Sequence, residues 1–352
     1  MTLTQVAFWT RRGVISFGVF IVVLTISIIG YNLWRAYYLA HLPPVEEKPE
    51  LKFGTLPSLN FPSTNVSTSN YSYSLDTVTG GFPKLPKISK VYFIPKLGLT
   101  LLSSERAQKL AESLGFPQGP TILSDTEYRF SDGNLGTLNI DLSTGNFHFQ
   151  RITATSSATL DDNAFTDQKR LVQDLKSYLG SKGLTSDTLN SGRDNIIFDS
   201  DLANTATSAE VSLWPADLDN LPIVTADFNK GLVKAVITKD RAETNKYLKL
   251  DNVFWTIDTT TSSTYPLKTP EQAFTDLKSG LGFVTMQSPN PKISITLVYL
   301  AYYESEEYSP FLQPVFVFEG PGFAAVVPAV SNTVFTPPTA STSAQPTRAS
   351  GN

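Results

Sequence analysis

The chain has 352 residues, of which 41% are hydrophobic and 17% are charged, a composition that supports a folded core and excludes a wholly disordered protein. It contains no cysteine, which excludes disulfide bonds, thiolate nucleophiles and cysteine-ligated metal centres. Basic and acidic residues number 28 and 32, and without an excess or a run of basic residues the sequence predicts no binding to nucleic acid.

The first element along the chain is an uncharged apolar run of 20 residues, Val14–Leu33. At a rise of about 1.5 Å per residue, a helix of this length matches the roughly 30 Å hydrocarbon core of a bilayer. A cleavable signal peptide has a shorter apolar region, about 7 to 15 residues, followed by small residues at the cleavage site. Because this run has neither feature, we predict an uncleaved transmembrane helix over residues 14–34, in contact with the lipid bilayer.

Charged residues on either side of the run indicate its orientation. Arg11 and Arg12 precede it without any acidic residue, whereas Arg35 and then mixed charges follow it. Basic flanks stay in the cytoplasm, so residues 1–13 are predicted to be cytoplasmic and the large C-terminal part extracytoplasmic. These three arginines are the only basic residues before the first acidic one, Glu46, which leaves 25 basic against 32 acidic residues beyond the anchor, a net charge of −7.

Two segments are predicted to lack a packed core of their own. Prolines spaced through residues 35–70 favour an extended spacer, at about 3.1 Å per residue. Its part Leu51–Pro62 is more apolar than a linker needs, so we expect some of it to pack on the folded domain. Residues 331–352 consist mainly of Ser, Thr, Pro and Ala, a composition typical of a disordered tail.

The first folded part, residues 71–155, is predicted to be a helix followed by an antiparallel meander. Apolar residues at helical spacing over Ser104–Leu114, with Gly115 directly after them, predict the helix and its end. Alternating apolar and polar runs, separated by turn residues, predict strands over residues 127–130, 137–142 and 147–152.

The second folded part, residues 156–330, contains the same kinds of element. Helices are predicted over residues 162–179 and 269–281, the latter with Pro270 in its first turn and Glu271 near the positive end of the helix dipole. Strands are predicted over residues 210–214, 223–228, 232–238, 252–258, 293–304, 314–319 and 323–330. The fold class is therefore α+β, with antiparallel β-sheets and helices packed on one face.

An internal similarity connects the two parts. Ser104–Phe116 and Pro270–Phe283 both carry Glu near the start of a helix and both end in Leu-Gly-Phe, with one residue more in the second copy. Duplication of a helix-plus-meander unit explains this similarity, and so does independent capping of two unrelated helices.

Together these elements resemble a known pattern. A helix ending in Leu-Gly-Phe, a meander, and a final strand pair that includes Phe311–Gly320 and Val327–Val330 are similar to the YycH/YycI-type extracytoplasmic regulators and, more loosely, to PepSY-like modules. The resemblance covers the single span and residues 71–330. It implies a non-enzymatic, membrane-tethered domain that contacts a protein partner, in those families a sensor kinase or a protease. The long proline-rich spacer of this chain departs from the pattern.

Motifs for catalysis or for cofactor binding are not found in the sequence. Of the two histidines, His41 lies in the spacer, and His148 alternates with Phe147 and Phe149 in a predicted strand, which turns its side chain to solvent. No G-x-S-x-G nucleophile elbow occurs. We therefore assign no catalytic, cofactor-binding or metal-ligating residue and predict a protein that is not an enzyme.

One group of aromatic and acidic residues between two predicted strands is the candidate surface site. It comprises Tyr302, Tyr303, Glu304, Glu306, Glu307 and Tyr308. Glycan-binding and glycosidase surfaces combine these residue types, and an exposed acidic turn would contain them as well.

Three functions are compatible with these observations. The leading one is a membrane-anchored extracytoplasmic module of the cell envelope that binds or regulates a protein or peptide partner. The alternatives are a cell-envelope glycan hydrolase that uses a carboxylate pair from the acids between residues 304 and 307, and an envelope scaffold without a ligand. Whether the acids near Tyr302 line a pocket or cap an exposed turn is the feature that distinguishes binding from catalysis.

Overall fold

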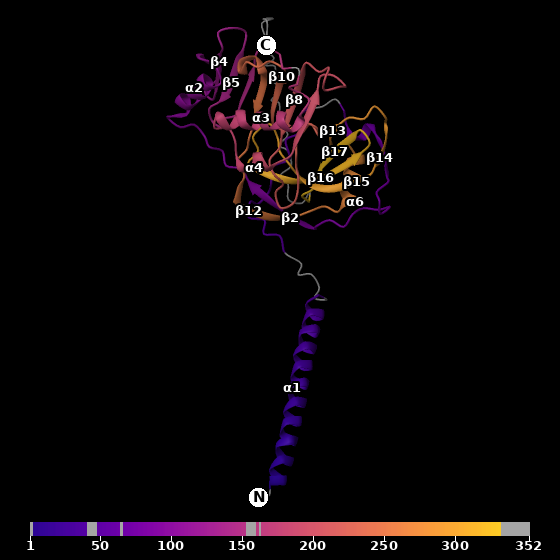
Figure 1. The fold of residues 1–352 in the computed structure, drawn as a ribbon. Coiled ribbons are helices and arrows are strands. Elements are labelled where there is room, and N and C mark those ends of the chain that lie inside the picture. The colour runs from indigo at the N-terminus through magenta and orange to yellow at the C-terminus, as the bar shows by residue number, and fades with distance from the viewer. Residues whose placement is uncertain (1–2, 41–47, 64–65, 153–159, 162, 332–352) are drawn as a thin grey trace, which may run out of the picture. The chain divides into compact units, whose positions relative to one another are not determined.

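The structure of the chain is a computed structural model that describes residues 3–40, 48–63, 66–152, 160–161 and 163–331 (Figure 1). It divides into two compact units, Met1–Lys48 and Pro49–Asn352. The predicted tail lies outside the described residues except for Ser331, and so do residues 41–47 of the predicted spacer.

The first unit is a single helix, α1 (Leu3–Ala40), of 38 residues. Its stretch Ser16–Tyr38 is long and apolar enough to cross a membrane, a property that a membrane anchor shares with a signal sequence. The helix continues past the predicted span of residues 14–34 on both sides, because no helix breaker interrupts either flank.

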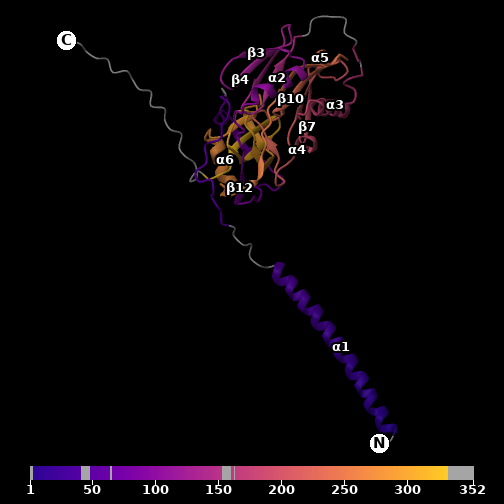
Figure 2. The same ribbon diagram turned by 90° about the vertical axis from the view of Figure 1, so that its left-hand side faces the viewer.

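The larger sheet of the second unit has eight strands, and each neighbouring pair is antiparallel (Figures 1 and 2). In spatial order its strands are β3 (Gln118–Ile122), β4 (Glu127–Ser131), β5 (Thr137–Asp141), β6 (Phe147–Gln150), β11 (Tyr247–Asn252), β10 (Val233–Thr238), β8 (Ser208–Leu213) and β7 (Asp194–Phe198). The three strands predicted between residues 127 and 152 are confirmed as β4, β5 and β6.

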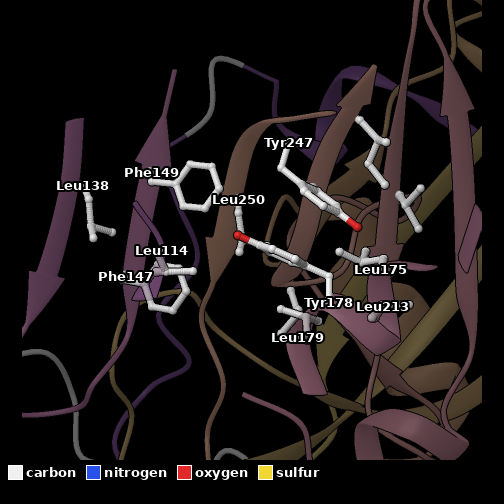
Figure 3. Close-up of a cluster of buried hydrophobic side chains, with 14 of the residues drawn as sticks. Leu114, Leu138, Phe147, Phe149, Leu175, Tyr178, Leu179, Leu213, Tyr247 and Leu250 are labelled. Carbon is white, nitrogen blue, oxygen red and sulfur yellow. The ribbon is translucent and has the colours of Figure 1, made fainter. Parts of the chain in front are cut away.

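Alternation along these strands turns one face of the sheet toward α2 (Ser103–Ser113) and α3 (Gln168–Ser181). Figure 3 shows this core, where sheet residues such as Phe149 and Leu250 pack with Leu175 of α3. The rings of Tyr178 and Tyr247 stack with centroids 4.0 Å apart. Two short helices, α4 (Asp187–Ser191) and α5 (Glu243–Lys246), complete this part.

A second sheet is built mainly from the C-terminal strands. Its main path is β12 (Asp258–Pro266), β2 (Ile88–Phe93), β16 (Phe311–Gly320), β15 (Leu297–Tyr303) and β9 (Ile223–Val224), and β17 (Phe323–Pro328) joins β16 to β13 (Phe283–Met286). Beside it, β1 (Ser72–Leu75) pairs in parallel with β14 (Lys292–Ile295). The sheet packs against α6 (Pro270–Lys278), which begins with a Thr269–Gln272 capping box.

The chain passes repeatedly between the two sheets. It leaves the larger sheet after β8, contributes β9 to the second sheet, and returns as β10. The predicted boundary between residues 155 and 156 lies outside the described residues. The strands β6 and β11, which come before and after it in the chain, pair in the same sheet. The prediction of a single strand over residues 252–258 is wrong. Asn252 ends β11 and Asp258 begins β12, and the residues between them cross from one sheet to the other.

The two helix-plus-strand units have different pairing. After α2 the strands β3 to β6 pair consecutively. After α6 the strand β13 pairs instead with β17, the last strand in chain order. The α+β class with antiparallel sheets is confirmed. The strands that the sequence missed are β1, β2, β3, β7, β11, β12 and β13. Some of them lack a clear apolar alternation, as in the Thr- and Ser-rich β12, whereas β1 alternates but has only four residues.

Residues 49–61, hereafter the strap, pack on the second sheet as the apolar segment Leu51–Pro62 predicted. Leu56 is fully buried, and Tyr265 donates a hydrogen bond to the carbonyl of Gly54 at 3.0 Å. The ring of Phe61 stacks on that of Phe283 at a centroid distance of 5.2 Å. The second half of the predicted spacer is therefore part of the folded domain.

Arg151 connects the end of α2 to the larger sheet. Its guanidinium is buried, donates to the carbonyls of Leu114 and Tyr247, and lies 4.6 Å from the ring centroid of Phe116. The α2 carbonyl at Leu114 thereby gains a charged donor where the helix leaves carbonyls unpaired.

We expect Arg151→Ala to lower the free energy of unfolding by about 2 kcal/mol, because a charged hydrogen-bond donor and its ring contact are both lost. Urea denaturation followed by tryptophan fluorescence measures this change. The control is Arg129→Ala, which removes an exposed arginine bonded to Asn139 and should change stability by less than about 0.5 kcal/mol. Equal effects of the two substitutions would contradict the role given to Arg151.

Candidate binding groove

The structure divides the predicted cluster into a buried part and a surface part. Tyr302 and Tyr303 end β15 and are buried. The Tyr302 hydroxyl donates to the carbonyl of Lys90 at 3.1 Å, and the Tyr303 hydroxyl donates to that of Asn60, in the strap, at 3.5 Å. Burial raises the pKa of both phenols, which favours their neutral, donating form. These two residues serve packing and do not line a surface site.

Glu304 is also buried, with only 3% of its surface exposed. Its amide donates to the carbonyl of Val224 at 2.8 Å, one step beyond the β9 and β15 pairing. Within the described residues its Oε1 has no hydrogen-bond partner. Burial raises the pKa of this carboxyl from 4.5 to about 8, because removal from water penalises the charged form.

The surface part of the cluster lines a groove of about 290 Å³. Glu306, Glu307 and Tyr308 form one side. The other lining residues come from the loop after β2, from β4 to β6 and their turns, and from the crossover after β11, namely Lys96, Glu127, Asn139, Asp141, Thr144, Asn146, His148, Val253 and Trp255. Hereafter these residues are called the groove. The acids between strands therefore line a hollow between the two sheets.

Hydrogen bonds fix the wall of the groove that carries Glu306 and Glu307. The indole Nε1 of Trp255 donates to the carbonyl of Ser305 at 2.7 Å, and the Tyr308 hydroxyl donates to that of Ile94 at 2.8 Å. The rings of Trp255 and Tyr308 meet edge to face at 5.7 Å. From the strap, the Asn60 side-chain amide donates to the carboxylate of Glu307. This wall is therefore held both by the crossover after β11 and the loop after β2, and by the strap.

Negative charge dominates the groove. Four carboxylates line it, those of Glu127, Asp141, Glu306 and Glu307, against one lysine, Lys96. Among the ion pairs between described residues, none involves these four carboxylates. The Lys96 ammonium lies 5.3 Å from the ring centroid of Tyr308. The groove therefore carries uncompensated negative charge beside two aromatic rings.

A row of polar side chains crosses the sheet face opposite the helices and reaches the groove at His148. In strand order from β4 to β7 its members are Arg129, Asn139, His148, Asp251, Lys234, Ser212 and Asn195. His148 has the solvent-facing position that alternation with Phe147 and Phe149 predicts. Its Nδ1 lies 3.0 Å from Oδ1 of Asp251.

Asp251 is the buried charge of this row, with 6% of its side chain exposed. Burial opposes its ionisation, but hydrogen bonds from His148 and Lys249 outweigh that effect. Together with the positive charge of Lys234 they hold the pKa of this carboxyl below its usual value. Asp251 thereby orients the imidazole of His148 at the edge of the groove.

Sequence reasoning found three groove residues, Glu306, Glu307 and Tyr308, and missed the rest of the lining. Lys96, Glu127 and Trp255 come from three separate segments of the chain, and only the topology brings them together. Polar alternation in the strands β4 to β6 was the one available signal, since it marks a solvent-facing side of the sheet. No group of three or more metal-ligating side chains converges within the described residues.

Two solved structures show distant similarity to the chain. No protein-family model matches the chain, and no curated protein matches it. An uncharacterized protein from Eubacterium rectale ATCC 33656 has 12% identity over 70% of this chain and 84% of its own, with a TM-score of 0.37. The C-terminal domain of Bacillus megaterium YpeB has 10% identity over 67% of this chain and 95% of its own, with a TM-score of 0.32.

These TM-scores are too low to place the chain in a family. The resemblance to YycH/YycI-type regulators and to PepSY-like modules stays a prediction.

Proposed function

We propose that this protein is a membrane-anchored, non-enzymatic module whose extracytoplasmic domain binds a protein or peptide partner in the groove. The observation that carries the proposal is the groove itself, a hollow between two sheets lined by two aromatic rings and by four carboxylates that form no ion pair with the described residues. Aromatic residues supply contact area at low entropic cost, and polar groups around them give specificity.

The construction of the groove supports binding in preference to catalysis. Glu306 and Glu307 are consecutive residues of one loop, and Glu307 already accepts a hydrogen bond from Asn60. Glu304, the third acid of the hydrolase alternative, is buried and outside the lining of the groove. A glycosidase needs two carboxyl groups on either side of the scissile bond. Only Glu127 or Asp141, from the larger sheet, could then supply the second carboxyl group.

Site-specific photo-crosslinking tests this proposal. A photoreactive residue in place of Glu306 in the full-length protein, expressed in its own host, should capture the same protein partner in each repeat. The matched control is a photoreactive residue in place of Glu112, an exposed glutamate of α2 outside the groove. Capture of the same protein at both positions contradicts the proposal. Capture of envelope glycan alone at Glu306, with glycan cleavage lost in Glu127→Gln, would replace it by the hydrolase function.

A further inference from the structure

A second hollow adjoins the groove. It measures about 210 Å³ and lies between the loop after β2, the first turns of α2 and the turn between β5 and β6. Apolar side chains form much of its lining, among them Leu97, Leu110, Ile140 and Leu142. Hereafter it is called the apolar hollow.

The two hollows share a wall. Asp141 and Thr144 line both of them, and the consecutive residues Lys96 and Leu97 line the groove and the apolar hollow respectively. A ligand that occupies the groove near Asp141 can therefore continue into the apolar hollow. The combined surface has one strongly acidic half with aromatic rings and one mostly apolar half, whose lining also includes Arg106, hydrogen-bonded to Thr100.

The loop beside the apolar hollow exposes leucines to an unusual degree. Leu97, Leu99, Leu101 and Leu102 have 75%, 52%, 103% and 59% of their surface exposed. Single exposed apolar residues are ordinary, but these four lie within six consecutive positions of one loop, and groups of exposed apolar residues mark interaction sites. One of them, Leu97, also lines the apolar hollow.

We infer that the groove and the apolar hollow together bind a peptide segment that carries lysine or arginine residues next to an apolar side chain. This inference rests on the proposed function and names the chemistry of the partner. The carboxylates of Glu127, Glu306 and Glu307 supply the negative charge that a cationic segment needs, and no lysine or arginine of the domain pairs with them among the described residues. The rings of Trp255 and Tyr308 accept the aliphatic stem or the cation of such a side chain.

Charge complementarity selects this partner over other ligand classes. An anionic lipid surface or an acidic peptide would place like charges against four carboxylates, which costs binding free energy. A neutral glycan would leave those carboxylates without a counter-charge and would not use the exposed leucines. A basic segment followed by an apolar residue places its cations against the carboxylates of the groove and its apolar side chain in the apolar hollow.

The test uses the full-length protein in nanodiscs of zwitterionic lipid and fluorescently labelled synthetic peptides of about ten residues, with empty nanodiscs as the background. One peptide has lysines followed by leucines, its twin has glutamates in place of the lysines, and a third replaces the leucines by serines. Fluorescence anisotropy measures the Kd of each. We expect the lysine and leucine peptide to bind, and both other peptides to bind at least roughly tenfold more weakly.

Variants assign the binding to its two halves. The double substitution Glu306→Gln and Glu307→Gln, and separately Leu97→Ser, should each weaken the lysine and leucine peptide by roughly tenfold. The control Glu112→Gln, an exposed acid of α2, should leave its Kd unchanged. Equal binding of the glutamate twin, or a Kd that none of the groove variants changes, would overturn the inference.

The two proposals fail separately. If photo-crosslinking at Glu306 captures a protein whose contact segment is acidic or neutral, the partner chemistry is wrong and the proposed function stands. If no protein is captured at that position and the lysine and leucine peptide also fails to bind, both are wrong.

Discussion

Replacing Glu304 by Gln is expected to stabilise the folded protein by about 3 kcal/mol at pH 7 and to have little effect below pH 4.5. The buried carboxyl keeps its proton up to about pH 8 in the native state, whereas the ordinary glutamate pKa of 4.5 applies once the chain unfolds. Between these two values the native state binds more protons, so its free energy of unfolding falls as the pH rises. One pKa unit corresponds to about 1.4 kcal/mol, which sets the size of the effect.

The measurement is urea denaturation of the full-length protein in detergent between pH 4.5 and pH 9. The wild type should lose stability steadily across this range and level off above about pH 8, where Glu304 is ionised in both states. The Glu304→Gln variant should lack that component of the slope. Glu306→Gln, which removes an exposed carboxylate two residues away, is the control and should retain the wild-type slope. An unchanged slope in Glu304→Gln would show that its carboxyl is ionised or solvated in the folded protein.

This buried acid also connects pH to the groove. Glu304 immediately precedes the loop that carries Glu306 and Glu307, and its amide is fixed to Val224 of β9. A buried carboxylate that ionises without a partner is destabilised, and contact with water lowers its free energy. We therefore expect alkaline pH to loosen the wall of the groove before the rest of the domain.

The burial of Glu304 shows where sequence reasoning ends. In the sequence it stands with Glu306 and Glu307 as one acidic turn. In the structure it is buried, and β9, from a distant part of the chain, pairs in parallel with the end of β15 and accepts a hydrogen bond from the Glu304 amide. The pairing of β9 with β15 joins residues far apart in the sequence, and no local sequence pattern predicts it. The same holds for Trp255, which reads as part of a strand and instead lies in the crossover that forms the groove.

Local sequence patterns correctly predicted features that depend on interactions between residues close in the sequence. Gly115 follows the C-cap residue Leu114 of α2 and has a positive φ of 82°. Thr269 and Gln272 cap the helix that has Pro270 in its first turn, and the alternation around His148 gives the correct face. Each of these depends on neighbours within a few residues. The groove depends on four separated segments, so its existence follows from topology alone.

Removing the side chain of Leu56 is expected to lower the free energy of unfolding by about 3 kcal/mol. Leu56 is fully buried beside Val91, Tyr265 and Val330, and Leu→Ala substitutions in such cores cost about 3 to 5 kcal/mol through lost transfer energy and the cavity left behind. The control Leu51→Ala changes a strap residue that is 39% exposed and should cost less than about 1 kcal/mol. Urea denaturation of both variants measures the difference, and equal costs would mean that the strap is not held by Leu56.

The strap matters for the groove because Asn60 lies on it. The carbonyl of Asn60 accepts hydrogen bonds from Tyr303 and Ser305, and its side-chain amide donates to Glu307. Loosening the strap with Leu56→Ala should therefore speed amide hydrogen exchange in residues 303–308 as well as in residues 49–61. Faster exchange in the strap alone would show that the stability of the groove wall, residues 303–308, does not depend on the strap. Faster exchange in both would show that the wall of the groove depends on the strap, the segment with which the second unit begins.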